Sequence, residues 1–203
     1  MKKKVLIIFL VILGITVYFL FFFKSEFNRK IFKKSYREYY LGLEKDIYFE
    51  KPIINEIEYN FTEEEEKSNK PEKIIFHHCA RNIWSPEDIN EYHKERGFIG
   101  IGYHFYIRKD GSVYKGRSED AIGAHTKGEN NNSIGICLEG NFENENISKE
   151  QRESLYNLSI YIINKYEIKD MKGHRSYAET LCPGKNFNEK EIKNNIIKKL
   201  REL

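Results

Sequence analysis

Residues 73–80 read Lys-Ile-Ile-Phe-His-His-Cys-Ala, an apolar run that ends in two histidines and a cysteine. A short continuous apolar run of this kind is typical of a β-strand that is buried on both faces of a sheet. Successive strand side chains point to opposite faces, so only one of His77 and His78 can face a given site. We therefore expect a strand buried on both faces, with His77 and His78 on opposite faces at its carboxyl end.

Local sequence signals predict helices on both sides of this strand. Ser85-Pro86-Glu87-Asp88 combines a capping hydroxyl, a proline suited to the first helical position and two acids, and the helix is expected to run to Arg96. Ser148-Lys-Glu-Gln151 is a capping box that opens a long helix with apolar residues at helical spacing. A last amphipathic helix is expected from about Glu189 to the end of the chain.

Further strands are predicted between these helices. Residues 104–108 and 112–116 flank the turn Lys109-Asp110-Gly111 and form a predicted hairpin, and residues 133–138 form a second buried strand. Because strands and helices interleave, the predicted fold class is α/β: a mixed central β-sheet flanked by helices. We place this single domain at residues 73–203.

The amino-terminal region has a different character. Lys2, Lys3 and Lys4 precede residues 5–23, which contain no charge. As a helix rising about 1.5 Å per residue, this run nearly spans the roughly 30 Å hydrocarbon core of a bilayer. It ends in Phe-Phe-Phe-Lys-Ser-Glu, without the small residues of a signal-peptide cleavage site. We expect an uncleaved transmembrane anchor in residues 1–24, and a juxtamembrane stalk and linker in residues 25–72.

Composition excludes some classes of partner. The net charge of +3 is small for 203 residues, and the lysines are interspersed with glutamates. No segment resembles a helix or ribbon that reads nucleic acid, so no nucleic-acid partner is expected. Three cysteines show no legible disulfide framework.

A second chemical motif lies near the carboxyl end, where residues 173–184 read Gly-His-Arg-Ser-Tyr-Ala-Glu-Thr-Leu-Cys-Pro-Gly. His174, Cys182 and an imidazole from residues 77–78 make three ligands of the kind that zinc prefers. Structural zinc takes four protein ligands, whereas catalytic zinc takes three and keeps a position for water. The alternative is a core histidine and a buried thiol that happen to be close.

Several motifs occur in order along the domain: Ile75-Phe-His-His-Cys-Ala, His93-Lys-Glu-Arg-Gly-Phe, Ile101-Gly-Tyr-His-Phe, Asp110-Gly-Ser-Val-Tyr-Lys-Gly-Arg117, Ile122-Gly-Ala-His125, Asn132-Ser-Ile-Gly-Ile and Gly173-His-Arg with Thr180-Leu-Cys-Pro-Gly. This series, over about residues 73–188, closely resembles the zinc-dependent N-acetylmuramoyl-L-alanine amidases. That family also includes amidase-type phage lysozymes and peptidoglycan recognition proteins.

The resemblance implies a zinc (Zn2+) cofactor and assigns its ligands to His77, His174 and Cys182. His77 is preferred to His78 because the family has a small residue two positions after the ligand. Here that residue is Cys79, whose thiol could face the same side and close the site into a four-ligand structural zinc.

The resemblance also assigns two catalytic residues. Tyr103 matches the family's active-site tyrosine, and Thr180 matches a position that the family fills with Thr or Lys. Zinc lowers the pKa of bound water from 15.7 to about 7. A donor such as Thr180 can stabilise the oxyanion that follows attack, and Tyr103 can orient the water or move a proton.

Three further residues match positions that line the family's groove for the muramyl-peptide: His125, Asn132 and Arg117. His125 and Asn132 are expected to hydrogen-bond the sugar or peptide. Arg117 is expected to meet a peptide carboxylate or, equally, to be structural. His93 and His104 are expected to be structural.

The implied protein is a membrane-anchored, monomeric zinc amidase that cuts the bond between N-acetylmuramic acid and L-alanine of peptidoglycan. Two alternatives stay open, a non-catalytic peptidoglycan-binding module and a phage-type lysis amidase. The expected location is a bacterial inner membrane, crossed once by residues 5–23, with the domain facing the wall or periplasm. Lys and Arg are more frequent after the apolar run than before it, which favours the opposite orientation.

Overall fold

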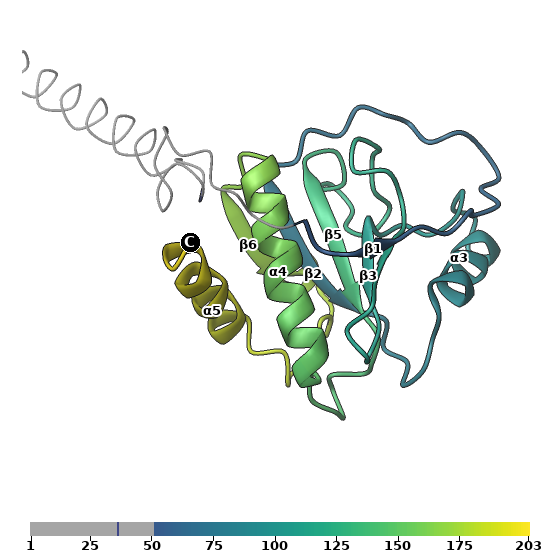
Figure 1. Cartoon of the computed structure of the whole chain (residues 1–203). Coiled ribbons are helices and arrows are strands. Elements are labelled where there is room, and N and C mark those ends of the chain that lie inside the picture. The colour runs from purple at the N-terminus through teal and green to yellow at the C-terminus, as the bar shows by residue number, and fades with distance from the viewer. Residues whose placement is uncertain (1–35, 37–50) are drawn as a thin grey trace, which may run out of the picture. The chain divides into compact units, whose positions relative to one another are not determined.

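The computed structural model describes residue 36 and residues 51–203, and in this part of the chain it contains a six-stranded mixed sheet and three α-helices (Figure 1). The elements in chain order are β1 (Ile54–Asn55), β2 (Lys73–His78), α3 (Pro86–Glu95), β3 (Phe105–Ile107), β4 (Val113–Lys115), β5 (Ser133–Leu138), α4 (Lys149–Lys165), β6 (Asp170–Gly173), the 3-10 turn η1 (His174–Ser176) and α5 (Glu189–Arg201). The strand order is β1-β4-β3-β5-β2-β6. The predicted fold class, a mixed sheet flanked by helices, is confirmed.

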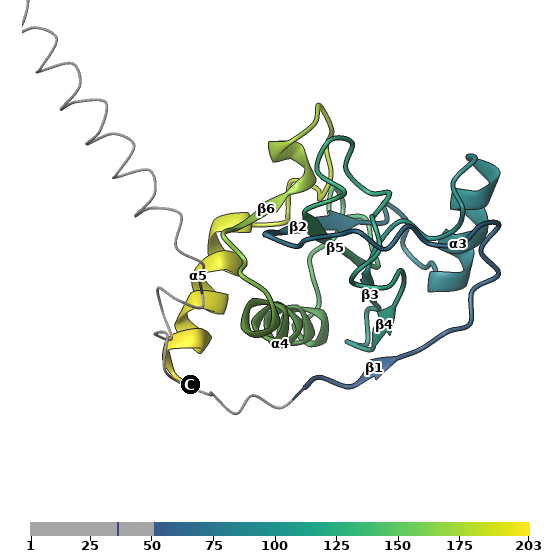
Figure 2. The same ribbon diagram turned by 90° about the horizontal axis from the view of Figure 1, so that it is seen from above.

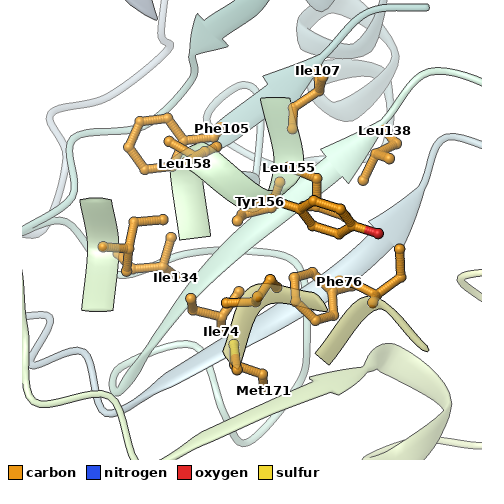
Figure 3. Packing of buried hydrophobic residues seen from close by; sticks show 14 of the residues in the cluster. Ile74, Phe76, Phe105, Ile107, Ile134, Leu138, Leu155, Tyr156, Leu158 and Met171 are labelled. Carbon is orange, nitrogen blue, oxygen red and sulfur yellow. The ribbon is translucent and has the colours of Figure 1, made fainter. Parts of the chain in front are cut away.

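The strand β2 lies inside the sheet, with parallel neighbours on both sides. Residues 74–78 are all buried, as the apolar run predicts. One face of the sheet packs against α4 and α5, and Figure 2 shows α4 on that side of the sheet, seen almost along its axis. Figure 3 shows members of this core: Ile74, Phe76, Phe105, Ile107, Ile134, Leu138, Leu155, Tyr156, Leu158 and Met171. The opposite face packs against α3 and carries a smaller cluster: Ile89, Ile101, Tyr106 and Cys137.

The predicted helix starts are confirmed in detail. Ser85 caps α3, where its hydroxyl accepts from the Asp88 amide and the Asp88 carboxylate accepts from the Ser85 amide. Ser148 and Gln151 form the same reciprocal pair at the start of α4. These caps satisfy amide groups that have no partner within the helix, so each local signal was sufficient to locate a helix start.

The predicted hairpin is confirmed as the antiparallel pair β3–β4, whereas β6 and β1 were not predicted. The strand β6 is only four residues long and alternates between half-buried and buried positions, so its sequence lacks an apolar run. Its place depends on pairing with β2, which is almost a hundred residues earlier in the chain. Such a contact leaves no local sequence signal.

Residues 51–72, part of the expected linker, pack against the domain. The Tyr59 hydroxyl donates to the Lys115 carbonyl, and the Tyr59 and Phe61 rings stack 5.7 Å apart against the face that carries α3. The Glu65 carboxylate accepts from the amide and hydroxyl of Ser118. Asn69 is buried and donates to the Ser133 carbonyl. This part of the expected linker is therefore the first packed segment of the described fold.

None of the helices in the described part of the chain is long and apolar enough to cross a membrane. The predicted anchor, residues 5–23, lies outside the described residues, as does most of the predicted stalk.

His104 is fully buried and forms hydrogen bonds to two other segments of the chain. Its Nδ1 accepts from the Gly135 amide at 3.0 Å, and its Nε2 lies 3.0 Å from the Ala121 carbonyl. A carbonyl can only accept, so Nε2 carries the ring proton and the imidazole is neutral. Burial lowers the pKa of His104 to about 4. Protonation would break the bond from Gly135.

His104 should make the domain sensitive to acid. Its folded-state pKa lies below its unfolded value of about 6.5, so between these pH values the unfolded chain binds more protons. The free energy of unfolding should fall as pH drops from about 6.5 to about 4, by up to roughly 1.4 kcal/mol per pH unit from this group. Urea denaturation across this range, with chelator present, should give a shallower slope for His104→Gln than for the unsubstituted protein. Equal slopes would contradict the assignment.

Candidate metal centre

The parallel pairing of β2 with β6 brings two histidines together. Phe76 lies opposite Gly173 in the register, and one residue further on are His77 and His174. The carboxyl ends of parallel strands meet at the same edge of a sheet, so these side chains leave the sheet side by side. Their ring centroids are 4.7 Å apart.

The loop after η1 returns to bring Cys182 beside both histidines. The Arg175 amide donates to the Cys182 carbonyl at 2.9 Å, which closes the loop. Gly184 has a φ of +98°, and a Cβ there would lie 2.4 Å from the Phe142 carbonyl carbon, so glycine is required at this turn. The ligand atoms of His77, His174 and Cys182 all lie within 4.8 Å of one another.

This cluster fits zinc. Two imidazoles and a thiol are its preferred donors, and ligands of a tetrahedral zinc with Zn–S near 2.3 Å and Zn–N near 2.0 Å lie roughly 3.5 Å apart. The observed separation between Cys182 Sγ and His77 Nδ1 is 3.6 Å. Burial lowers the pKa of His77 well below its usual range, which leaves the neutral imidazole that metals bind. Burial raises the pKa of the Cys182 thiol to about 12, so zinc binding would displace its proton.

The two residues that follow His77 in the sequence are turned away from the cluster. His78 Nδ1 accepts from the Phe142 amide at 3.1 Å on the opposite face of the sheet. Cys79 Sγ accepts from the Gly140 amide at 3.3 Å and donates to the Arg81 carbonyl at 3.2 Å. The alternative in which Cys79 completes a four-ligand site is therefore not supported, because the strand ends at His78 and period-two alternation no longer directs the thiol.

A cavity of about 530 Å³ opens beside the cluster. Its lining residues are His93, Arg96, Phe98, Tyr103, Ala124, His125, Thr126, Lys127, Gly128, Asn130, His174 and Ala178. Tyr103, one of the lining residues, has its ring centroid 5.1 Å from that of His77. Burial raises the pKa of Tyr103 well above its usual range, so the phenol keeps its proton. Thr180 Oγ1 accepts from the Cys182 amide at 3.2 Å, a bond that does not use the hydroxyl proton, and Thr180 lies outside the cavity lining.

The three residues expected to bind the muramyl-peptide are placed differently. His125 lines the cavity. Arg117 is buried, and its guanidinium donates to the carbonyls of Ile101 and Ile122, which gives it a structural role. Asn132 lies near Lys73, outside the cavity lining. Contact of Arg117 and Asn132 with substrate stays a prediction without support from these positions.

His93, expected to be structural, also lines the cavity. It lies in the last turn of α3, and its Nδ1 accepts from the Gly102 amide at 2.9 Å. Its ring centroid is 5.4 Å from that of Tyr103. Burial lowers the pKa of His93 to about 4, so the imidazole that lines the cavity is neutral. The predicted end of the helix near Arg96 is the sequence signal that could have placed His93 at a loop-lined edge of the domain.

Comparison with known proteins agrees with this geometry. Residues 67–185 match the family described as N-acetylmuramoyl-L-alanine amidase. The endolysin of Escherichia phage T7 is 35% identical over 140 residues, covering 64% of this chain and 93% of the endolysin. The endolysin amidase LysCS from Clostridium intestinale has 45% identity and a TM-score of 0.71, covering 72% of this chain and 97% of that structure.

A more distant relative shares the fold. Drosophila PGRP-LB has 32% identity and a TM-score of 0.56, covering 64% of this chain and 83% of that structure. The family match spans more than half of the present chain and includes the three clustered candidate ligands, Tyr103 and Thr180. This chain therefore belongs to the N-acetylmuramoyl-L-alanine amidase family.

Proposed function

We infer that this chain is a peptidoglycan hydrolase that cleaves the amide bond between N-acetylmuramic acid and L-alanine, and we propose zinc as its cofactor. The observation that carries the proposal is the convergence of His77, His174 and Cys182, with ligand atoms within 4.8 Å beside a cavity. The family match supports the reaction, and the donor set supports the metal.

Two other roles can be weighed against the same site. A non-catalytic peptidoglycan-binding module needs no metal, so the presence of Cys182 among the clustered ligand atoms argues for the enzyme. The phage T7 relative and LysCS are both endolysins, which favours bacterial lysis as a second candidate role for the same reaction.

Hydrolysis joins a water oxygen to the carbonyl carbon, breaks the carbon–nitrogen bond and delivers a proton to the leaving amine. Zinc held by the three ligands would supply Lewis acidity and an activated water at neutral pH. The Thr180 hydroxyl, already accepting from Cys182, would donate to the carbonyl oxygen as negative charge develops there. Tyr103 keeps its proton, so it would act as a hydrogen-bond donor or acid toward the reacting amide.

The cellular setting is also a proposal. Residues 5–23 would hold a monomeric enzyme in the bacterial inner membrane, with the domain facing the wall. The support is the uncharged run after Lys2, Lys3 and Lys4, together with a substrate that lies outside the cytoplasm in intact wall. The basic residues after the run favour the opposite orientation.

Removing any ligand should abolish hydrolysis. Three protein ligands provide no redundancy, so His77→Ala, His174→Ala and Cys182→Ala should each lose bound zinc and activity. Cys79→Ser is the matched control, because the Cys79 thiol bonds to backbone groups of Arg81 and Gly140 and lies outside the cluster of ligand atoms. It should keep about one zinc per chain and most activity. Metal analysis and an assay of muramyl-peptide cleavage would test the ligand variants and the control. Full activity in metal-free protein would contradict the proposal.

Thr180→Val and Tyr103→Phe should lower kcat while zinc stays bound. Loss of one donor to a developing oxyanion should cost about 10²–10³-fold for Thr180→Val. Loss of a positioned proton donor should cost about 10²–10⁴-fold for Tyr103→Phe. Steady-state kinetics with parallel metal analysis would check this. Unchanged kcat in either zinc-loaded variant would remove that residue from the mechanism.

Reporter fusions should place the carboxyl terminus outside the cytoplasm. One reporter active only in the periplasm and one active only in the cytoplasm, each fused after Leu203, would measure the orientation. Signal from the cytoplasmic reporter alone would reject the wall-facing arrangement and favour an amidase that acts on imported muropeptides.

A further inference from the structure

The ring edge of His77 that faces away from Cys182 contacts another histidine, His125. His77 Nδ1 lies 3.6 Å from Cys182 Sγ, whereas His77 Nε2 lies 3.1 Å from His125 Nδ1. Both histidines are buried, with exposed fractions of 1% and 8%. Two imidazole nitrogens at this distance share one proton, so the protonation pattern of His125 decides which nitrogen of His77 is free.

Ser133 determines which nitrogen of His125 is protonated, because its hydroxyl contacts His125 Nε2. The Ser133 hydroxyl lies 2.6 Å from the Glu129 carbonyl, which can only accept, so the hydroxyl proton is directed there. Its oxygen lies 3.4 Å from His125 Nε2 and is left as an acceptor. His125 therefore carries its proton on Nε2 and presents an unprotonated Nδ1 to His77.

Thr126 is compatible with this assignment. Its Oγ1 lies 3.1 Å from His125 Nδ1 and 3.4 Å from His77 Nε2. The hydroxyl can donate to an unprotonated His125 Nδ1 or accept from a protonated His77 Nε2, so both contacts agree with the assignment. An unprotonated His77 Nε2 would instead set two nitrogen lone pairs against each other at 3.1 Å.

The ring of His125 is held in this orientation by its surroundings. A Cβ at either Gly123 or Gly135 would lie 2.5 Å from His125 Cδ2, so the ring fits only because both residues lack a side chain. The amides of His125 and Thr126 both donate to Asn130 Oδ1, at 3.0 and 2.8 Å, which fixes the backbone of the loop.

We propose that Ser133 and His125 are positioning residues that hold His77 in the tautomer whose Nδ1 is free to bind the metal. Outer hydrogen-bond partners of metal-binding histidines fix the tautomer and raise ligand basicity. The inference rests on the proposed zinc site, and it gives His125 a role through His77 that is separate from its predicted contact with substrate.

The first test reads the tautomer in the metal-free full chain, without depending on zinc. Imidazole ¹⁵N chemical shifts should show His77 protonated on Nε2 in the unsubstituted protein. They should show a mixture of tautomers in His125→Leu. A His77 ring protonated on Nδ1 in the unsubstituted protein would overturn the proposal.

The second test measures zinc affinity of the full chain by chelator competition. His125→Leu should weaken zinc binding by about 10- to 100-fold. His125→Asn should bind more tightly than His125→Leu, because its amide oxygen can replace Nδ1 as acceptor. Ser133→Ala should lose about 2- to 10-fold, the worth of one hydrogen bond. Its matched control is Ser159→Ala, which removes a buried hydroxyl in α4 that has no hydrogen-bond partner.

The outcomes separate this inference from the proposed function. An unsubstituted chain that binds no zinc would reject the proposed cofactor, while the His77 shifts would still decide the tautomer. Unchanged zinc affinity in folded Ser133→Ala and His125→Asn, together with an unchanged His77 tautomer, would overturn the positioning role. If His125→Leu fails to fold, these two variants carry the test.

Discussion

The site depends on the parallel pairing between β2 and β6. Gly173 lies opposite Phe76, and this register delivers His77 and His174 to one edge of the sheet from positions almost a hundred residues apart. A slip by one residue would send His77 to the opposite face, where His78 now accepts from Phe142. The core beneath α4 and α5 therefore specifies the register that the chemistry requires.

Burial of several imidazoles next to one another also constrains the site. His77, His104 and His125 are all buried, and the burial of each lowers its pKa. Neutral rings that form hydrogen bonds with their neighbours satisfy their polar atoms without bringing charge into the interior. This arrangement suits a metal ligand, because the neutral imidazole is the form that binds a metal ion.

Patterns within a few residues were enough to predict β2, the hairpin and the helix starts at Ser85 and Ser148, because caps and apolar runs are local. The ordered motifs likewise identified the three clustered residues. Sequence did not reveal β6, whose place depends on a distant partner. Nor did it reveal that Arg117 is committed to backbone carbonyls, because hydrogen-bond partners in loops follow from the folded path of the chain.

The position of β6 at the edge of the sheet has a kinetic consequence. In the described part of the chain β6 has one strand neighbour, and it leads directly into η1, which carries His174. Edge segments open locally at lower free energy than strands inside the sheet. Opening of β6 and η1 would withdraw one ligand while the main core stays folded. Release of a metal bound there would be coupled to fraying of this edge, and occupancy of the site would in turn protect the β6 amides from hydrogen exchange.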